Sequence, residues 1–84
     1  MFQRGQIVLA KAGKEKGSFL IVLKQEGRML YLADGKLRTI SRPKLKNKAH
    51  AAKTRRIVPE EELETDKKIR TALRNFRNAD QLEG

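Results

Sequence analysis

Four short apolar runs, separated by glycine-containing turns, fill the first forty residues of this 84-residue chain. The runs cover residues 6–12, 18–24, 29–33 and 36–40, and apolar runs of this length between turn signals predict β-strands. Several such strands at close spacing favour a small antiparallel barrel in a mostly β protein. We expect two of the connections to be tight hairpins, since each contains a glycine that tolerates positive φ.

The composition changes after residue 40. Residues 41–54 are polar and basic around Pro43, with almost no side chain apolar enough to bury, so a long loop is predicted there. A last short strand over residues 55–58 is then expected to close the barrel, because a sheet of this size needs its edges paired. Residues 1–58 are therefore predicted to form a barrel that includes the long basic loop.

A C-terminal helix is predicted over about residues 66–77, with Thr65 or Asp66 as its cap. The apolar stripe of this helix consists of Ile69, Ala72, Leu73 and Phe76. We expect the stripe to dock on the barrel, because its spacing places all four side chains on one helix face. Residues 59–84 thus contain an acidic linker, this amphipathic helix and, from Asn78, a frayed tail.

Positive charge is concentrated in the predicted barrel. The chain carries 20 Lys and Arg against 10 Asp and Glu, a net charge of +10. Residues 1–58 account for +12 and residues 59–84 for −2. Residues 36–56 contain nine positive side chains and no acidic one, and a segment of one sign held between strands favours an anionic partner.

We predict a non-catalytic protein that binds structured RNA through the sugar-phosphate backbone, with low sequence specificity. RNA is favoured over DNA because no recognition-helix, zinc-ligand or basic-heptad pattern for reading the major groove is present. Two alternatives remain open: a protein-interaction module in transcription or ribosome assembly, and a general binder of DNA or anionic membrane surfaces. The candidate RNA-binding residues are Lys11, Lys14, Lys16, Arg38, Arg42, Lys44, Lys46, Lys48, Lys53 and Arg55.

The pattern of glycines and strands over residues 4–58 resembles a KOW domain. The matching segments are Gly5-Gln6-Ile7-Val8, Gly13-Lys14-Glu15-Lys16-Gly17, the apolar strand that follows, and Ala33-Asp34-Gly35. The basic stretch over 42–48 and the C-terminal helix are similar to those of bacterial KOW-type RNA-binding proteins, which are related to large-subunit ribosomal proteins of archaea and eukaryotes. Gly17 matches the family's characteristic glycine, whereas Leu20 stands where many KOW motifs have a second one.

The resemblance implies an SH3-like barrel. It also implies that the loop over residues 11–17 faces RNA or, in some transcription elongation factors, a protein. Ribosomal RNA is the partner that the resemblance favours, with ribosomal or transcription proteins as further partners. We expect Phe19 and Tyr31 to pack in the core of this barrel rather than to stack on bases.

Other chemistries are disfavoured by the same sequence. Cysteine is absent, which excludes disulfides and thiolate metal sites. His50 is the only histidine, and no carboxylate nearby in the sequence could form a metal site or a catalytic pair with it. The glycine loop over residues 13–17 lacks the ending of a nucleotide-binding P-loop, and the acidic residues 60–64 are typical of a solvated segment. We expect no cofactor, no metal, no membrane association and a monomeric cytoplasmic protein.

Overall fold

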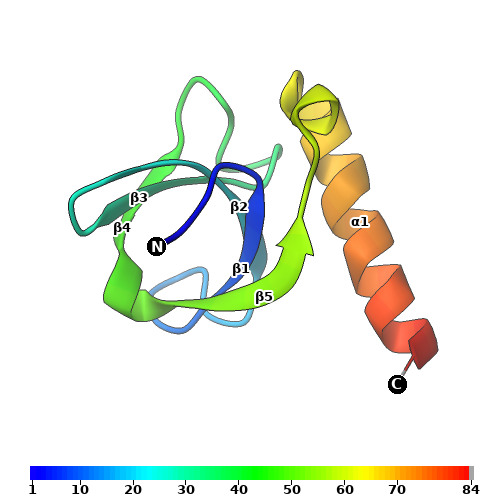
Figure 1. The fold of residues 1–84 in the computed structure, drawn as a ribbon, viewed down its shortest axis with the longest axis horizontal. Coiled ribbons are helices and arrows are strands. Elements are labelled where there is room, and N and C mark those ends of the chain that lie inside the picture. Colours follow the sequence, from blue (N-terminus) through cyan, green and yellow to red (C-terminus); the bar gives the residue numbers. More distant parts are fainter. Residues whose placement is uncertain (84) are drawn as a thin grey trace.

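The computed structural model describes the backbone of residues 1–83 and the side chains of residues 1–79. A curved five-stranded antiparallel sheet is followed by one long helix that lies against a face of the sheet (Figure 1). In chain order, the elements are β1 (Gln6–Ala10), β2 (Phe19–Glu26), β3 (Met29–Ala33), β4 (Lys44–Asn47), the 3-10 turn η1 (Lys48–His50), β5 (Ala51–Ile57), the 3-10 turn η2 (Glu60–Leu63) and α1 (Asp66–Glu83).

The strands follow the order β4-β3-β2-β1-β5, and all neighbouring strands are antiparallel. β1 pairs with both β2 and β5, so the first and last strands of the chain lie side by side. The sheet is not closed, because β4 and β5 form its two edges. Within residues 1–83, only β2 and β3 are joined by a tight hairpin, in which Glu26 pairs with Met29, whereas two tight hairpins were predicted.

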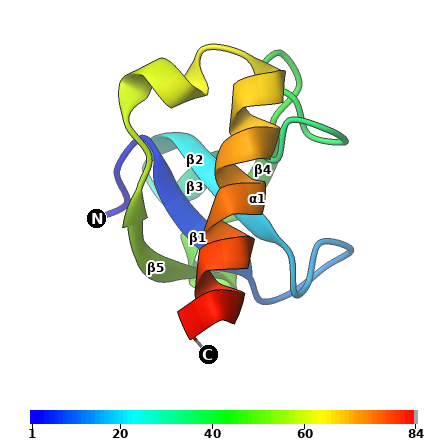
Figure 2. The ribbon, with the colours of Figure 1, turned by 90° about the vertical axis from the view of Figure 1, so that its right-hand side faces the viewer.

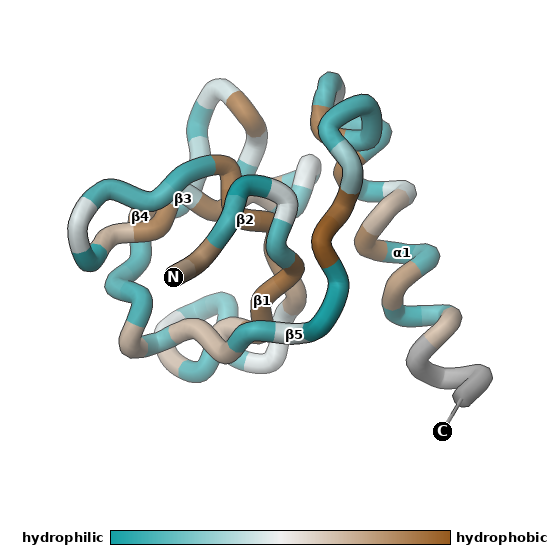
Figure 3. Tube along the Cα trace, viewed as in Figure 1, coloured by the Kyte–Doolittle hydropathy of each residue, from teal (hydrophilic) through white to brown (hydrophobic). Residues whose placement is uncertain are grey.

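Apolar side chains cover both faces of the sheet. One cluster, on the inner face of the curve, contains Val8, Ala10, Leu20, Val22, Leu30, Leu32 and Ala51. The other, between the sheet and α1, contains Ile7, Ile21, Leu23, Ala33, Val58, Leu63, Ile69, Ala72 and Leu73. Neighbouring residues of a strand point to opposite faces, so β1 and β2 read as continuous apolar runs because both of their faces are buried. Figure 3 shows hydrophobic stretches in these strands and between β5 and η2.

α1 docks on the sheet through the predicted apolar stripe. Ile69, Ala72 and Leu73 of this stripe are buried. The ring of Phe76 contacts the ring of Phe19 edge-on, with a distance of 5.1 Å between the ring centroids. Phe19 is therefore part of the helix–sheet contact, as the expectation of core packing required.

The two ends of α1 differ in how well they were predicted. Thr65 caps the first turn, because its Oγ1 accepts a hydrogen bond from the backbone N–H of Lys68 at 3.1 Å. The helix then continues to Glu83, so the predicted end near residue 77 is wrong, and fraying of residues 78–83 stays a prediction. No Gly or Pro interrupts these six residues, and Gly84 lies outside the described part of the chain.

Residues 36–40, predicted as a strand, belong instead to the connection between β3 and β4. The Asp34 carboxylate accepts hydrogen bonds from the backbone N–H groups of Lys36 and Arg38, both at 2.8 Å. A side chain that bonds the backbone in this way folds the chain into a turn and removes donors that a strand would need. Leu37 consequently lies 83% exposed at the surface.

The prediction of a long loop over residues 41–54 is wrong. This segment contains β4, η1 and the first half of β5, and its Ala51 is buried in the inner cluster. The basic composition is nevertheless compatible with strands, because β4 and β5 are edge strands, where lysines are common and prevent unwanted pairing. Pro43 stands directly before β4, where a missing N–H is tolerated. The last strand therefore begins at Ala51 and not at Arg55.

Gly35 brings the β3–β4 connection into contact with α1. Its φ is +77°, and a Cβ at this position would collide with the backbone oxygen of Asp66 and lie 2.9 Å from Cγ of Arg70. Arg70 Nη1 in turn donates a hydrogen bond to the Gly35 carbonyl oxygen. The missing side chain thus allows the loop and the helix to approach closely, which places the cations of both segments on one surface.

Candidate nucleic-acid interface

Two basic loops are joined by one carboxylate. The β1–β2 loop covers residues 11–18, and the β3–β4 loop covers residues 34–43. Glu15 of the first loop accepts two hydrogen bonds at Oε2 from Arg38 of the second, one from Nη2 at 2.7 Å and one from Nε at 3.2 Å. A guanidinium that binds a carboxylate through two N–H groups is held in one orientation, so this pair fixes the two loops relative to each other.

Lys46 of β4 also contacts the first loop. Its Nζ donates a hydrogen bond to the carbonyl oxygen of Ala12 at 2.9 Å and lies 3.8 Å from Oε1 of Glu15. The side chain is only 7% exposed. Lys46 was predicted to bind RNA, but its ammonium group faces protein oxygens, which makes it a structural cation that holds the first loop on β4.

The Glu15 carboxylate is ionised within this group of cations. The hydrogen bonds from Arg38 hold the pKa of the Glu15 carboxyl below its usual value; burial acts in the opposite direction, and the charge of Lys44 lowers the pKa further. We call Glu15, Arg38, Lys44 and Lys46 the loop cluster. One carboxylate cannot neutralise three cations, so the loop cluster stays positive overall.

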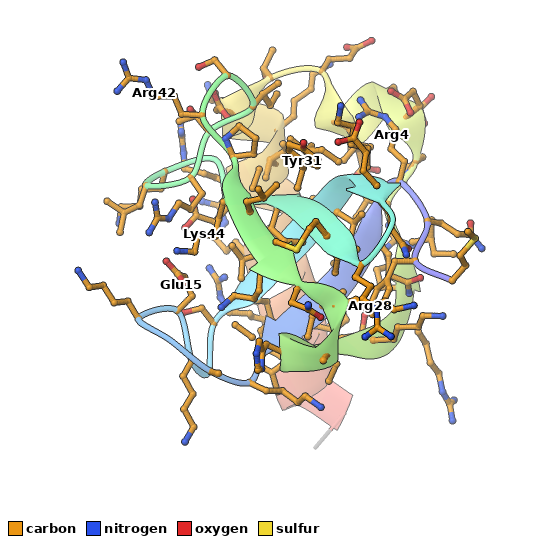
Figure 4. The ribbon with its side chains drawn as sticks, turned by 90° about the vertical axis from the view of Figure 1, so that its left-hand side faces the viewer. Arg4, Glu15, Arg28, Tyr31, Arg42 and Lys44 are labelled. Atoms are coloured by element: carbon orange, nitrogen blue, oxygen red, sulfur yellow. The ribbon has the colours of Figure 1, made fainter. Side chains whose placement is uncertain are left out.

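The predicted RNA-binding residues differ in exposure. Arg38 and Lys44 are half-buried, and Lys46 is buried. Figure 4 shows Arg42 and Lys44 on the same side of the molecule as Glu15. The exposed members of the predicted set are Lys11, Lys14, Lys16, Arg42, Lys48, Lys53 and Arg55.

The structure divides these residues between the loops and the far edge of the sheet. Lys53 and Arg55 lie on β5, which is the opposite sheet edge from β4. Lys53 Nζ donates to the carbonyl oxygen of Met1 at 2.8 Å and lies 5.1 Å from the ring centroid of Phe2, so this cation holds the N-terminal segment. Lys48 belongs to η1. Of the predicted residues outside the loop cluster, the two loops supply Lys11, Lys14, Lys16 and Arg42.

Several other charges are already paired. Arg4 contacts Glu60 at 2.9 Å, and this hydrogen bond raises the pKa of Arg4 and lowers that of Glu60. The Tyr31 hydroxyl donates to the Glu26 carboxylate at 2.7 Å, which raises the pKa of Tyr31. Tyr31 is half-buried and directs its hydroxyl to the surface, and Lys24 Nζ lies 4.6 Å from its ring centroid. These groups are less available to an anion than the loop cations.

Sequence reasoning missed two features of this surface. Glu15 was regarded only as a turn residue, although it is the single carboxylate of the first loop and stands between two lysines. The basic residues of α1 were left out of the predicted RNA-binding set, although three arginines recur at intervals of four and three residues. Together with Lys36, these arginines line a groove between α1 and the two loops, and they are Arg70, Arg74 and Arg77.

Among the residues whose side chains are described, no three His, Cys, Asp or Glu side chains lie close enough together to hold a metal ion. No helix within residues 1–83 has the length and apolar character needed to cross a membrane. No protein-family model matches the chain, and no curated protein sequence is significantly similar to it.

Proposed function

We propose that this protein binds structured RNA, with ribosomal RNA as the first candidate, through phosphate contacts and without catalysing a reaction. The observation that carries this proposal is the joining of two basic loops through Glu15 and Arg38 at 2.7 Å. Cations on joined loops have a fixed spacing, so less conformational entropy is lost when they bind a rigid polyanion than when a free loop does so.

Each loop supplies exposed cations with a distinct role. Arg42 offers a planar fork of N–H groups that suits two oxygens of one phosphate, whereas Lys14 and Lys16 act as mobile point charges. Contacts of both kinds fix the position of the nucleic-acid backbone but read little sequence. We therefore expect selection by the shape of the RNA more than by its bases.

We further assign the curved sheet to the SH3-like barrel of KOW domains. In support, β1 pairs with both β2 and β5, which brings the first and last strands together. Gly17, near the end of the β1–β2 loop, has a φ of +88°, a conformation that favours glycine at this position. Leu20, the departure from the common motif, is fully buried in the inner cluster, where a glycine would leave a cavity.

The test is a salt titration of affinity for structured ribosomal RNA fragments. Each phosphate contact contributes about 0.7 to 0.9 to the slope of log affinity against log salt. The double variant Lys14→Gln/Arg42→Gln removes one exposed cation from each loop, so we expect its slope to be shallower by about 1.4 to 1.8. The control, Lys67→Gln/Lys68→Gln, removes the same charge from α1 beside the acidic residues of η2 and should leave the slope unchanged.

Two results would contradict the proposal. One is a wild-type affinity for folded RNA that does not depend on salt. The other is an equal loss of slope in the loop variant and in the control variant, because that would show a response to net charge alone. Equal competition by duplex DNA or by anionic vesicles would favour a general polyanion binder instead.

A protein-interaction module is the second candidate function, and exposed apolar side chains favour it. Leu37 is 83% exposed, Leu45 is 48% exposed and Ile40 is 36% exposed, all on or beside the β3–β4 loop. Exposed apolar side chains that lie near one another are typical of protein contacts. Affinity capture with and without nuclease separates the two functions: proteins retained after nuclease and lost in Leu37→Ser support this candidate, and proteins lost with nuclease support RNA binding.

A further inference from the structure

A groove runs between α1 and the two basic loops. It has a volume of about 460 Å³, and it is partly open to solvent. Figure 2 shows both loops on the same side of α1. The groove is lined by Phe19 of β2 and Leu73 of α1, and by residues 17 and 18 of the β1–β2 loop. We call it the α1 groove.

The walls of the α1 groove are strongly positive. Lys36 comes from the β3–β4 loop, and three arginines come from α1: Arg70, Arg74 and Arg77. Because a helix rises about 1.5 Å per residue, these arginines form a row about 10 Å long. Asp34 is the one acidic side chain in the lining, and its carboxylate already accepts two backbone hydrogen bonds at 2.8 Å.

The arginines of the row are not equivalent. Arg70 donates to the Gly35 carbonyl oxygen and so holds the loop against the helix. Arg74 and Arg77 are exposed, and neither forms an ion pair or a side-chain hydrogen bond with any other described side chain or backbone group. Two neighbouring guanidinium groups with no acid partner among the side chains of residues 1–79 repel each other, and this repulsion is relieved when an anion lies between them.

We propose that the α1 groove is a second binding site for the RNA phosphate backbone, reached by the same RNA that contacts the loop cluster. This proposal rests on the proposed function. The β1–β2 loop joins the two sites, because Glu15 on one side of it binds Arg38 while residues 17 and 18 on the other side line the groove. An RNA strand that crosses the β1–β2 loop therefore contacts cations on both sides of the loop.

The helix itself argues against a membrane as the occupant of the groove. A basic helix that binds a lipid surface needs an apolar face free to enter the headgroup region. In α1 the apolar residues Ile69, Ala72 and Leu73 are buried against the sheet. Over the part of α1 whose side chains are described, residues 66–79, the exposed face carries the arginines, and a concave basic surface fits a polyanionic chain.

The test uses the double variant Arg74→Gln/Arg77→Gln in the full chain. The matched control is Lys67→Gln/Lys68→Gln, which removes the same charge from the same helix beside Glu61 and Glu62, away from the groove. For a folded ribosomal RNA fragment, we expect the arginine variant to bind at least tenfold more weakly near physiological salt. Its slope of log affinity against log salt should be shallower by about 1.4 to 1.8, and that of the control should match the wild type.

A second measurement locates the contact directly. NMR signals of the arginine Nε–H groups should shift for Arg74 and Arg77 when the RNA is added, and should do so less for Arg4, which is paired with Glu60. If the wild type does not bind the RNA fragment, the proposed function itself is refuted. If the wild type binds and the arginine variant behaves like the control, the function stands and the groove site is refuted. The groove site is also refuted if the arginine variant has a lower affinity for anionic phosphatidylserine vesicles but an unchanged affinity for RNA.

Discussion

Replacement of Glu15 by glutamine isolates the contribution of one carboxylate to the loop cluster. One Glu15 oxygen accepts both hydrogen bonds from Arg38, and the other lies 3.8 Å from Lys46 Nζ. A glutamine has a single carbonyl oxygen, so it satisfies either Arg38 or Lys46 and turns an NH₂ group toward the other cation. The Glu15→Gln variant should therefore lose stability even though its shape is unchanged.

The expected loss follows from the exposure of the partners. A hydrogen bond to a charged group contributes about 1.5 to 3 kcal/mol, and solvent reduces the contribution of exposed pairs. The side chains of Glu15 and Arg38 are 12% and 33% exposed, so screening is small for the first and partial for the second. We expect a loss of about 2 kcal/mol at pH 7, which lowers the urea midpoint by roughly 1 to 2 M for a domain of this size.

The stability contribution of Glu15 should depend on pH. The folded-state pKa of Glu15 is lowered, so its stabilising contribution is present above the unfolded-state pKa of about 4.3 and is lost as the pH falls through the folded-state pKa. The stability difference between wild type and Glu15→Gln should be full at pH 7 and should shrink below about pH 4.

Urea unfolding followed by circular dichroism at pH 7 and pH 3 measures both quantities. Glu26→Gln is the control, because Glu26 and its contacts with Lys24 and Tyr31 are exposed at the surface, where solvent screens them, and it should cost less stability than Glu15→Gln. A Glu15→Gln variant as stable as the wild type at pH 7, or a difference that stays the same at both pH values, would refute this account of the loop cluster.

Further predictions concern the packing around the interface. Gly35→Ala should cost about 1 to 3 kcal/mol in urea unfolding, because its Cβ meets the backbone of α1, whereas Gly27→Ala, with open space around it, should cost less. Lys46→Met should lower stability by about 1 to 2 kcal/mol, because the Ala12 carbonyl loses its donor, yet leave the salt slope of RNA binding unchanged. Leu73→Ala should cost about 2 to 5 kcal/mol in thermal or urea unfolding, since the side chain is buried between α1 and the sheet.

The parts of the fold with strong apolar patterns could be predicted from the sequence. β1, β2 and β3 coincide with the first three apolar runs, and α1 docks through the predicted stripe. These elements bury their side chains, so hydrophobicity determines both their type and their orientation. The open edges of the sheet depend on backbone pairing, and the length of α1 depends on the absence of a helix breaker. Neither can be predicted from hydrophobicity.

The segment over residues 36–57 shows where such reasoning stops. Leu37 and Ile40 looked like strand residues, but the Asp34 carboxylate bonds the backbone that follows and folds it into a turn. Lys44 and Lys46 looked like loop residues, but edge strands accept lysines, and the long lysine stem of Lys46 lies in the core with its ammonium bonded to the backbone. Here side-chain hydrogen bonds decide the structure.

The candidate site was predictable as a composition and not as an arrangement. The sequence places Lys14 and Lys16 correctly in the first loop, but it does not reveal that Lys46 is buried on β4 or that Lys53 lies on β5 and contacts the N-terminal segment. It also does not reveal that α1 contributes a basic wall, because the last 26 residues have a net charge of −2. The acidic residues of η2 mask the arginines in that sum, although the two groups lie on different faces.

The folded chain assigns its positive side chains to three roles, and in the proposed function only one of these roles releases counterions from RNA. Some cations, such as Arg4, are paired with acids, and others, such as Lys46, hold the backbone. The remaining cations, on the loops and in the α1 groove, are free to approach phosphates. Because the salt slope counts phosphate contacts and not net charge, it should be far smaller than the 20 positive side chains suggest. Arg38 and Lys46 are among the cations that do not count, because their contacts with Glu15 and with the Ala12 carbonyl hold the loops from which the free cations project.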